Sequence, residues 1–387
     1  MIAAVYTQGG KFVIDDLPPP QPEDDEILLR VEAAGICGTD VKIVRHGHRK
    51  LRAGQRIVLG HEFVGVIEEI GSRVSGFSVG MRVGVAPNIG CGRCEMCGRG
   101  LGNMCPDFSA FGIDRDGAHT ELVRIPQAAI AQGNLIPLGP TVSPLDAALA
   151  EPLSCVVNAM RSVALSAGEM VLVYGAGPMG LLNMMLASAM GASRVLVVDQ
   201  DDQRLHRARE LGASAVLNSR TLPVPEWVGE QTGGRGVDVV VTAAAVPELQ
   251  TEAIGLLAPF GRLNCFAGLP NGGGLVALDT NAIHYRNLSV TGTTGGSARD
   301  YRDAVRLIES RRVNVASVVS DVFPIRAVGR AYDRALAGGG MKVLIAAEKY
   351  VRPRRMAVRA QDREAEPPAA SAPAGGVVAD ANEVGVP

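Results

Sequence analysis

Residues 171–180 read Val-Leu-Val-Tyr-Gly-Ala-Gly-Pro-Met-Gly, an apolar run that leads directly into a glycine-rich turn. The run predicts a buried strand over 171–174, and the helix formers after it predict a helix over 179–189. A G-x-G-x-x-G turn between strand and helix is typical of dinucleotide-binding proteins. Its first glycine permits a tight turn, its second lets a pyrophosphate approach the backbone, and its third allows close packing of helix on strand. The partial positive charge of the helix N-terminus adds to the attraction for phosphate.

An acidic residue follows this turn at a useful distance. The next predicted strand, 195–199, ends at Asp199, 24 residues after Gly175; such folds place a ribose-binding carboxylate about 20 residues on. A carboxylate there repels a 2′-phosphate, which favours NAD over NADP, whereas Arg204 could accommodate that phosphate. The alternative is a glycine turn that binds nothing. The predicted cofactor-binding residues are Gly175, Gly177, Pro178, Met179, Gly180, Asp199 and Arg204.

The pattern around this turn sets the fold class. From Glu169 onward strands and helices alternate, with a helix over 203–211 and short apolar runs over 237–242, 261–267 and 288–292. Alternation of this kind predicts an α/β, doubly wound parallel sheet with helices on both faces. The first 150 residues read as mainly β, with short apolar runs between proline and glycine turn signals. Two helices, over 298–310 and 327–336, and a strand over 343–346 come last.

Four cysteines lie within fifteen residues, spaced C-x2-C-x2-C-x7-C: Cys91, Cys94, Cys97 and Cys105. Four thiolates at short spacing suit a tetrahedral zinc ion with no open position, which predicts a structural zinc. An iron–sulfur cluster also uses short cysteine spacings, but the final gap of seven argues against it. The remaining alternative is four free thiols in a glycine-rich loop.

A second set of metal-ligating residue types lies upstream. Cys37, in Gly-Ile-Cys-Gly-Thr-Asp, and His61, in Gly-His-Glu, offer a thiolate and an imidazole. With a third, carboxylate ligand these would leave one position of a zinc ion open, as a catalytic zinc requires. Glu62 and Glu151 are the candidates for that third place. Taken singly, Cys37 reads as a buried thiol and His61 as a core histidine; their combination with the nucleotide turn favours the metal site.

Composition excludes several classes of protein. The 387 residues carry a formal net charge of −2 and only 4% aromatic residues. Neither an electrostatic field for nucleic acid nor a stacking platform for single strands is indicated. Residues 170–192 contain no charged residue, but five of them are glycine or proline, which predicts strand, turn and buried helix rather than a membrane span. No secretory signal is apparent, so a cytoplasmic protein is expected.

Together these motifs resemble the medium-chain zinc-dependent alcohol dehydrogenases, within them the sorbitol (L-iditol) and threonine dehydrogenase branch. The resemblance covers roughly 3–348. It implies a catalytic domain with a partly β, chaperonin-10-like core over 1–152, including the zinc loop 91–105, and a Rossmann domain over 153–296. The chain then returns to the catalytic domain over 297–348. Residues 349–387, rich in Ala, Pro, Arg and Glu, are predicted to be a disordered tail.

The resemblance also implies roles for site residues. Cys37, His61 and Glu62 would hold the catalytic zinc, with Glu151 binding it in some states. Thr39 would accept the hydroxyl proton, and Asp40 would fix His61 through its other ring nitrogen. The family often has histidine three residues after Thr39; this chain has Lys42, so Lys42 or water would carry the proton onward. Cys155 is expected to be a small buried side chain.

A basic stretch follows, without an acidic residue: Lys42, Arg45, His46, His48, Arg49, Lys50, Arg52 and Arg56. In the family this stretch borders the substrate cleft, so a phosphorylated or carboxylated substrate is one interpretation. A solvated basic surface loop is the other.

The function that the resemblance implies is oxidation of a secondary alcohol of a polyol, sugar alcohol or cyclitol by NAD, with two zinc ions per chain. Alternatives within the family are a polyol-phosphate dehydrogenase, a threonine 3-dehydrogenase and an aminocyclitol dehydrogenase. A non-catalytic nucleotide-binding protein on the same fold is the alternative from another class. Pairing of Rossmann sheets near 288–292 would give a homodimer or homotetramer.

Overall fold

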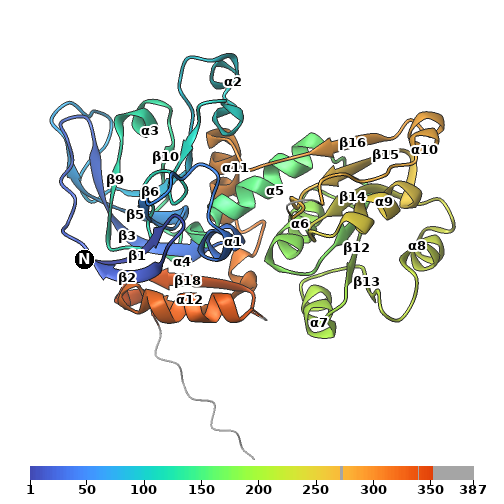
Figure 1. The fold of residues 1–387 in the computed structure, drawn as a ribbon. Coiled ribbons are helices and arrows are strands. Elements are labelled where there is room, and N and C mark those ends of the chain that lie inside the picture. Colours follow the sequence, from blue (N-terminus) through green and yellow to red (C-terminus); the bar gives the residue numbers. More distant parts are fainter. Residues whose placement is uncertain (271–272, 339, 352–387) are drawn as a thin grey trace, which may run out of the picture. The chain divides into compact units, whose positions relative to one another are not determined.

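The computed structural model describes residues 1–270, 273–338 and 340–351. Within them the chain builds one parallel sheet and a group of mainly antiparallel sheets (Figure 1). The expected α/β fold with a second, partly β domain is therefore confirmed.

The parallel sheet contains six strands in the order β13-β12-β11-β14-β15-β16. Numbered from β11, this order is 3-2-1-4-5-6, that of the Rossmann fold. Because the order reverses beside β11, the crevice at the carboxyl ends of β11 and β14 is the expected ligand position. The strands are β11 (Met170–Tyr174), β12 (Arg194–Asp199), β13 (Ala215–Asn218), β14 (Val237–Thr242), β15 (Leu257–Cys265) and β16 (Ser289–Gly292).

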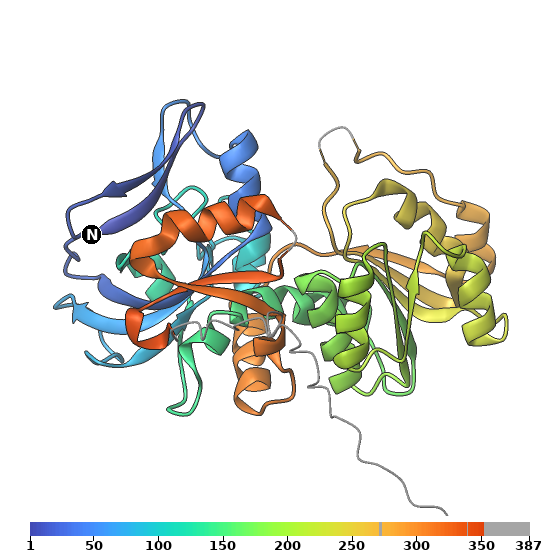
Figure 2. The same ribbon diagram turned by 90° about the horizontal axis from the view of Figure 1, so that it is seen from below.

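Helices lie on both faces of this sheet, as Figure 2 shows. One core cluster contains Val171 and Val173 with side chains of α5 and α6; another contains Leu172 and Tyr174 with side chains of α8 and α9. Alternate residues of one strand thus point into opposite cores, the period of two that a strand requires. The helices are α5 (Ala150–Ser162), α6 (Pro178–Ala189), α7 (Asp202–Glu210), α8 (Val224–Thr232), α9 (Pro247–Leu256) and α10 (Thr280–Tyr285).

The antiparallel part is built on β3 and β5, which pair over most of their length. Its larger sheet contains β10 (Leu135–Pro137), β6 (Arg82–Val85), β5 (Glu62–Ile70), β3 (Ile27–Ile36), β9 (Leu122–Ile125), β18 (Lys342–Ala346) and β17 (Val319–Pro324). The smaller sheets contain β2 (Phe12–Asp16), β1 (Ile2–Thr7) and β4 (Arg56–Val58), and β7 (Asn88–Ile89) with β8 (Ser109–Ala110). The helices here are α1 (Gly38–His46), α2 (Glu95–Gly98), α3 (Gln127–Ala131), α4 (Pro144–Ala147), α11 (Ala298–Glu309) and α12 (Val328–Ala337).

The end of the chain returns to its beginning. β18 pairs antiparallel with β3, and α12 packs against β18, β1 and β3, so the red segment lies among the blue strands in Figure 1. The last described residues stay attached there, since Lys349 and Tyr350 both donate hydrogen bonds to Glu32. The predicted disordered tail begins at 349, and from 352 on it lies outside the described residues.

Helix α5 was not predicted from the sequence. It packs against α6 and α11 and also contacts β5 and β16, one strand of each large sheet. Nine of its thirteen residues are buried, and its less buried face is a narrow stripe of Cys155, Asn158, Arg161 and Ser162. The predicted domain boundary at 152/153 falls inside this helix.

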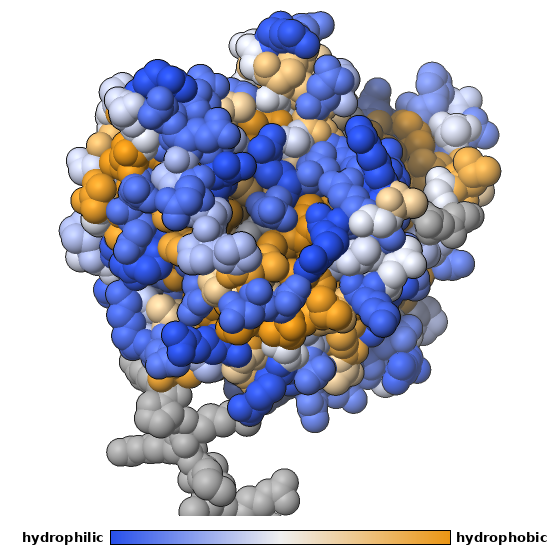
Figure 3. Space-filling view, turned by 60° about the vertical axis from the view of Figure 1, so that its left-hand side comes forward, coloured by the Kyte–Doolittle hydropathy of each residue, from blue (hydrophilic) through white to orange (hydrophobic). Residues whose placement is uncertain are grey.

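The uncharged segment 170–192 forms β11, the glycine turn and α6. No helix in the described ranges is long and apolar enough to cross a membrane. The face drawn in Figure 3 is mostly hydrophilic, with hydrophobic side chains gathered in a strip between polar ones.

Candidate active site

Cys37, His61 and Glu62 come together at one end of the β3–β5 pair. Cys37 follows β3 and caps α1, while His61 and Glu62 stand at the start of β5, where Glu62 pairs with Gly35. One ligand atom from each of the three lies within 4.8 Å of the others. A Cβ on residue 35 would lie 2.1 Å from Glu62 Oε2, so glycine there makes room for the carboxylate.

This donor set fits a zinc ion. Sulfur, imidazole nitrogen and one carboxylate are the ligand types of catalytic zinc, and three ligands leave a position for substrate. Glu62 Oε2 is buried without a hydrogen-bond partner, which marks it as an atom still able to bind a cation.

Asp40 stands behind His61. Its Oδ2 accepts a hydrogen bond from the Cys37 backbone N–H at 2.8 Å, and its Oδ1 lies 3.4 Å from His61 Nδ1. Burial alone would raise the pKa of Asp40, but His61 lowers it to about 2. A carboxylate beside Nδ1 leaves Nε2 as the nitrogen for a metal, the positioning role predicted for Asp40.

Lys342 is part of the site, and sequence reasoning missed it. From β18 its Nζ donates a 2.5 Å hydrogen bond to Glu62 Oε1, and both side chains are buried. Burial lowers the pKa of Lys342, but the charges of Glu62 and Cys37 raise it above its usual value, so the ammonium stays charged. The available signal was a lysine at the head of the otherwise apolar run 342–346.

Glu151 lies beside the cluster rather than within it. It comes from the first turn of α5 and is buried; its Oε1 accepts a hydrogen bond from Cys155 Sγ at 3.6 Å. Burial, together with the charge of Glu62, raises the pKa of Glu151 to about 7. Cys155 is half-buried and borders the same cavity, so it contacts the site more directly than a core residue would.

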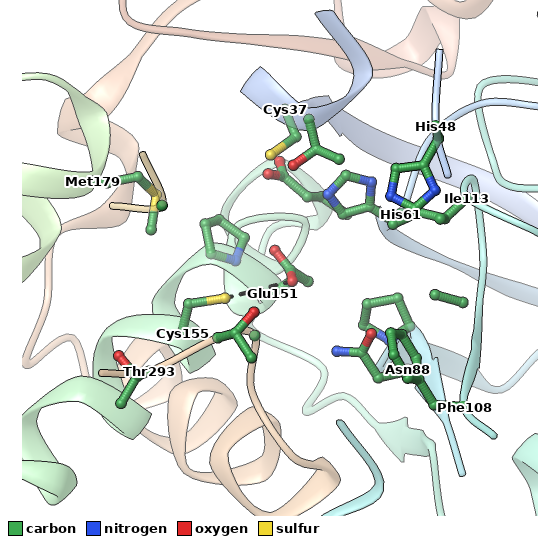
Figure 4. Close-up of a pocket in the computed structure, with 18 of the residues that line it drawn as sticks. Cys37, His48, His61, Asn88, Phe108, Ile113, Glu151, Cys155, Met179 and Thr293 are labelled. Atoms are coloured by element: carbon green, nitrogen blue, oxygen red, sulfur yellow. Dashed lines mark hydrogen bonds between the residues drawn. The ribbon is translucent and has the colours of Figure 1, made fainter. Parts of the chain in front are cut away.

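A cavity of about 480 Å³ joins these groups to the nucleotide turn. Its lining includes Cys37, Thr39, His61, Glu62 and Glu151. Met179, in the first turn of α6, also lines it. Figure 4 shows Met179 facing Cys37 and Glu151 across this space. Lys42, by contrast, is exposed on α1 and does not line the cavity.

The glycine turn has the geometry of a dinucleotide site. Gly177 caps α6, and Asp199 ends β12, where its Oδ2 accepts a 2.6 Å hydrogen bond from the Ala176 N–H. Arg204 lies near the turn, because a Cβ on Gly177 would be 3.9 Å from its Nη1. Pro178 occupies the first turn of α6. The predicted cofactor residues are thus assembled at one edge of the sheet.

Gly180→Ala should disrupt this turn. The added Cβ would lie 1.7 Å from the carbonyl oxygen of Gly175, and such overpacking costs about 1–3 kcal/mol. We expect a lower melting temperature and weaker NADH binding, measured by calorimetry and fluorescence titration. The matched control is Gly177→Ala, whose Cβ meets nothing nearer than Arg204. It should keep the melting temperature while weakening NADH binding, and an equal loss of stability in both variants would contradict this interpretation.

The four-cysteine loop brings its sulfurs together. Cys91, Cys94, Cys97 and Cys105 form a group within 4.8 Å, and Cys94 Sγ lies 3.7 Å from Cys105 Sγ. The Cys91 N–H donates to Cys105 Sγ and the Cys97 N–H to Cys94 Sγ. Backbone N–H groups lower the pKa of Cys91 to about 6, which favours the thiolate that a zinc ion needs. All seven cysteines lie in the described ranges and none is in a disulfide.

Comparison with known proteins covers both parts of the chain. Residues 23–137 match the family "Alcohol dehydrogenase GroES-like domain" and residues 178–310 match "Zinc-binding dehydrogenase". Sorbitol dehydrogenase of Bacillus subtilis is 33% identical over 342 residues, 87% of this chain and 94% of that protein. L-threonine 3-dehydrogenase of Pyrococcus horikoshii is 33% identical over 326 residues, 83% and 90% of the two chains.

Solved structures agree with this. A putative zinc-binding dehydrogenase from Sinorhizobium meliloti bound to NADP superposes with a TM-score of 0.82 at 30% identity, over 89% of this chain and 98% of that one. A structure described as a short chain alcohol dehydrogenase (rspB) from Escherichia coli, complexed with NADH, gives 0.81 at 27% identity, over 89% and 99%.

Proposed function

This chain belongs to the zinc-dependent medium-chain alcohol dehydrogenase family, and from that premise we propose that it oxidises a secondary alcohol of a polyol, sugar alcohol or cyclitol to a ketone with NAD. It is an oxidoreductase acting on alcohol groups. The observation that carries the finer proposal is the shared cavity, which Cys37, His61 and Glu62 line together with Met179 of the nucleotide turn. Hydride transfer needs the alcohol carbon and the nicotinamide in direct contact, and this cavity supplies one space for both.

The protein's own groups then have the following roles. Zinc held by Cys37, His61 and Glu62 would stabilise the alkoxide form of the substrate, and NAD would accept the hydride. Thr39, which lines the cavity, would take the hydroxyl proton. Asp40 would orient His61, and Lys342 binds one oxygen of Glu62, which would leave the other oxygen free to bind the metal. With Lys42 outside the cavity, we propose water as the next proton carrier.

We propose NAD rather than NADP as the cofactor. Asp199 is held beside the turn by N–H groups of Ala176, Gln200 and Asp201, and its negative charge opposes a 2′-phosphate. Arg204 is the feature that favours NADP, and one solved relative was bound to NADP. Asp199 ends β12 and accepts a hydrogen bond from the turn itself, and a carboxylate at this position of the fold binds ribose hydroxyls, which supports NAD.

Threonine oxidation is a second candidate, favoured by the relatives named L-threonine 3-dehydrogenase. Polyol phosphates and aminocyclitols remain alternatives within the same chemistry.

We further propose a cytoplasmic homodimer or homotetramer. The parallel sheet ends at β16, whose exposed strand edge, with Val290 39% exposed, offers a pairing surface. Unpaired cysteines suit a reducing compartment.

The test is NADH formation by the zinc-loaded protein, followed by absorbance, over a panel of alcohols. The panel holds free polyols, their phosphates, cyclitols, aminocyclitols and threonine, each with NAD and with NADP. Turnover of a polyol or cyclitol with NAD, in its free or its phosphorylated form, is the expected result. Turnover of threonine alone would transfer the proposal to the second candidate. Binding of zinc and NADH without turnover of any alcohol would favour a non-catalytic nucleotide-binding protein.

A further inference from the structure

The segment after α1 forms one wall of the active-site cavity. Of the eight basic residues over 42–56, His48, Arg49 and Lys50 line it. Others are used elsewhere: Arg45 donates to the carbonyl of Leu336, and Arg56 pairs with Asp15 at 2.6 Å. The basic wall, defined as His48, Arg49 and Lys50, therefore borders the same space as the metal ligands.

Lys50 fixes this wall in place. Its ammonium donates to the carbonyl of Phe108, lies 3.4 Å from Asp114 and sits 3.2 Å from the centre of the Phe108 ring. With these partners its side chain is only 20% exposed. Because these partners already satisfy its ammonium, Lys50 is less available to bind a ligand. Its contacts instead fix the position of the segment that includes His48 and Arg49, which line the cavity.

His48 presents a fixed donor. Its Nδ1 accepts a hydrogen bond from the Lys50 N–H at 3.3 Å, which leaves the proton on Nε2. Burial and the neighbouring charges of Arg49 and Lys50 lower the pKa of His48, so the ring is neutral with a single N–H to donate. Figure 4 shows the His48 ring beside that of His61.

Arg49 is the free charge of the wall. Its side chain is exposed, and no hydrogen bond or ion pair joins it to any residue within the described ranges. A guanidinium carries a planar set of donors that binds carboxylate and phosphate with two parallel hydrogen bonds. Its position on the cavity wall leaves those donors available to a ligand.

No acidic group of the cavity balances this charge. The carboxylates among its described lining residues are Glu62 and Glu151. Glu62 is already paired with Lys342, and Glu151 is buried, with its Oε1 accepting a hydrogen bond from Cys155 Sγ. Asp114 is paired with Lys50 and does not line the cavity.

We propose that the alcohol substrate carries an anionic group, a phosphate or a carboxylate, which Arg49 and His48 bind while the reacting hydroxyl lies at Cys37, His61 and Glu62. This inference rests on the proposed dehydrogenase function and narrows its substrate class to anionic hydroxy compounds. Arg49 and His48 are thus specificity-determining residues, and they act on binding rather than on hydride transfer.

Arg49→Ala tests the proposal in the zinc-loaded full chain. Loss of a charged hydrogen-bonding partner should raise KM for an anionic alcohol roughly 10-fold or more, with kcat nearly unchanged. KM for the neutral parent alcohol and for NAD should not change. Arg49→Lys should recover part of the loss. The matched control is Arg52→Ala, three residues on, exposed and outside the cavity.

Two arms separate the possible anions. A polyol phosphate and a sugar acid are compared as substrates, and inorganic phosphate and acetate are compared as competitive inhibitors against the alcohol. If Arg49→Ala weakens the binding of only one of these anions, and Arg52→Ala does not, that anion is the group that the site binds. Equal inhibition of the wild type and Arg49→Ala by both anions would overturn the proposal, as would a rise in KM for NAD.

Failure of the proposed function gives a different result. Phosphorus NMR reports binding of inorganic phosphate without any turnover. Phosphate bound through Arg49, with no alcohol oxidised, would reject the dehydrogenase function and keep the anion site. An anionic alcohol oxidised with the same KM by the wild type and by Arg49→Ala would keep the function and reject the anion site.

Discussion

Lys342→Met should lower the apparent free energy of unfolding by about 3–5 kcal/mol, because removing one partner of a buried ion pair leaves the other charge uncompensated. Both side chains of the Lys342–Glu62 pair are buried, and Oε2 of Glu62 already lacks a partner. Urea denaturation measures the change. The loss should be larger in chelator-treated than in zinc-saturated protein, because a bound zinc ion would supply a second positive charge at Glu62.

Two further variants separate charge from packing. Lys342→Arg keeps the positive charge and should retain most of the stability. The double variant Lys342→Met with Glu62→Gln removes both charges and should be more stable than Lys342→Met alone. If the double variant were instead the least stable, the loss would come from packing rather than from the unpaired carboxylate.

Cys37→Ser should remove the catalytic zinc and leave the cysteine-loop zinc in place, so metal analysis should find about one zinc per chain instead of about two. A metal ion that polarises the reacting oxygen supplies several kcal/mol, so kcat/KM should fall roughly 10³-fold or more. Cys37 is also the N-cap of α1, and serine is a good N-cap, so the melting temperature should change little.

Cys94→Ser is the matched control for the other site. It should also leave about one zinc per chain, but its main effect should be a lower melting temperature, because closed four-cysteine sites stabilise the fold. Similar losses of stability in both variants would contradict the assignment of one catalytic and one structural zinc.

Local signals predicted part of the nucleotide half of the fold, whereas β13, α8, α9 and α10 were not predicted and β15 begins four residues before the predicted strand 261–267. The strand predicted over 237–242 is β14 without any shift, and the helix predicted over 179–189 differs from α6 by one residue. Both signals are local, because β11 is an apolar run that ends in the glycine turn and the run 239–241 of β14 consists of valines. Helix α5 was missed because α6, α11 and strands of both sheets cover most of its surface, so that its polar face is only a narrow stripe.

The third zinc ligand and its lysine partner could not be predicted from the sequence, because they depend on pairing between distant strands. Cys37 with His61–Glu62 was recognised from short motifs, but the choice between Glu62 and Glu151 stayed open. The structure groups Glu62 with Cys37 and His61. The partner that holds Glu62, Lys342, is 280 residues away along the chain. No spacing rule connects two residues so far apart, whereas β18 places them in contact by pairing with β3.

That pairing has a consequence for biosynthesis. A chain emerging from the ribosome exposes Cys37, His61 and the four-cysteine loop early, yet Glu62 receives its lysine only after β18 has left the ribosome. In a chain that ends before residue 342, Glu62 has no lysine from β18 to pair with. All four sulfurs of the cysteine loop are present once residue 105 has been made, whereas the Lys342–Glu62 pair is complete only near the end of synthesis.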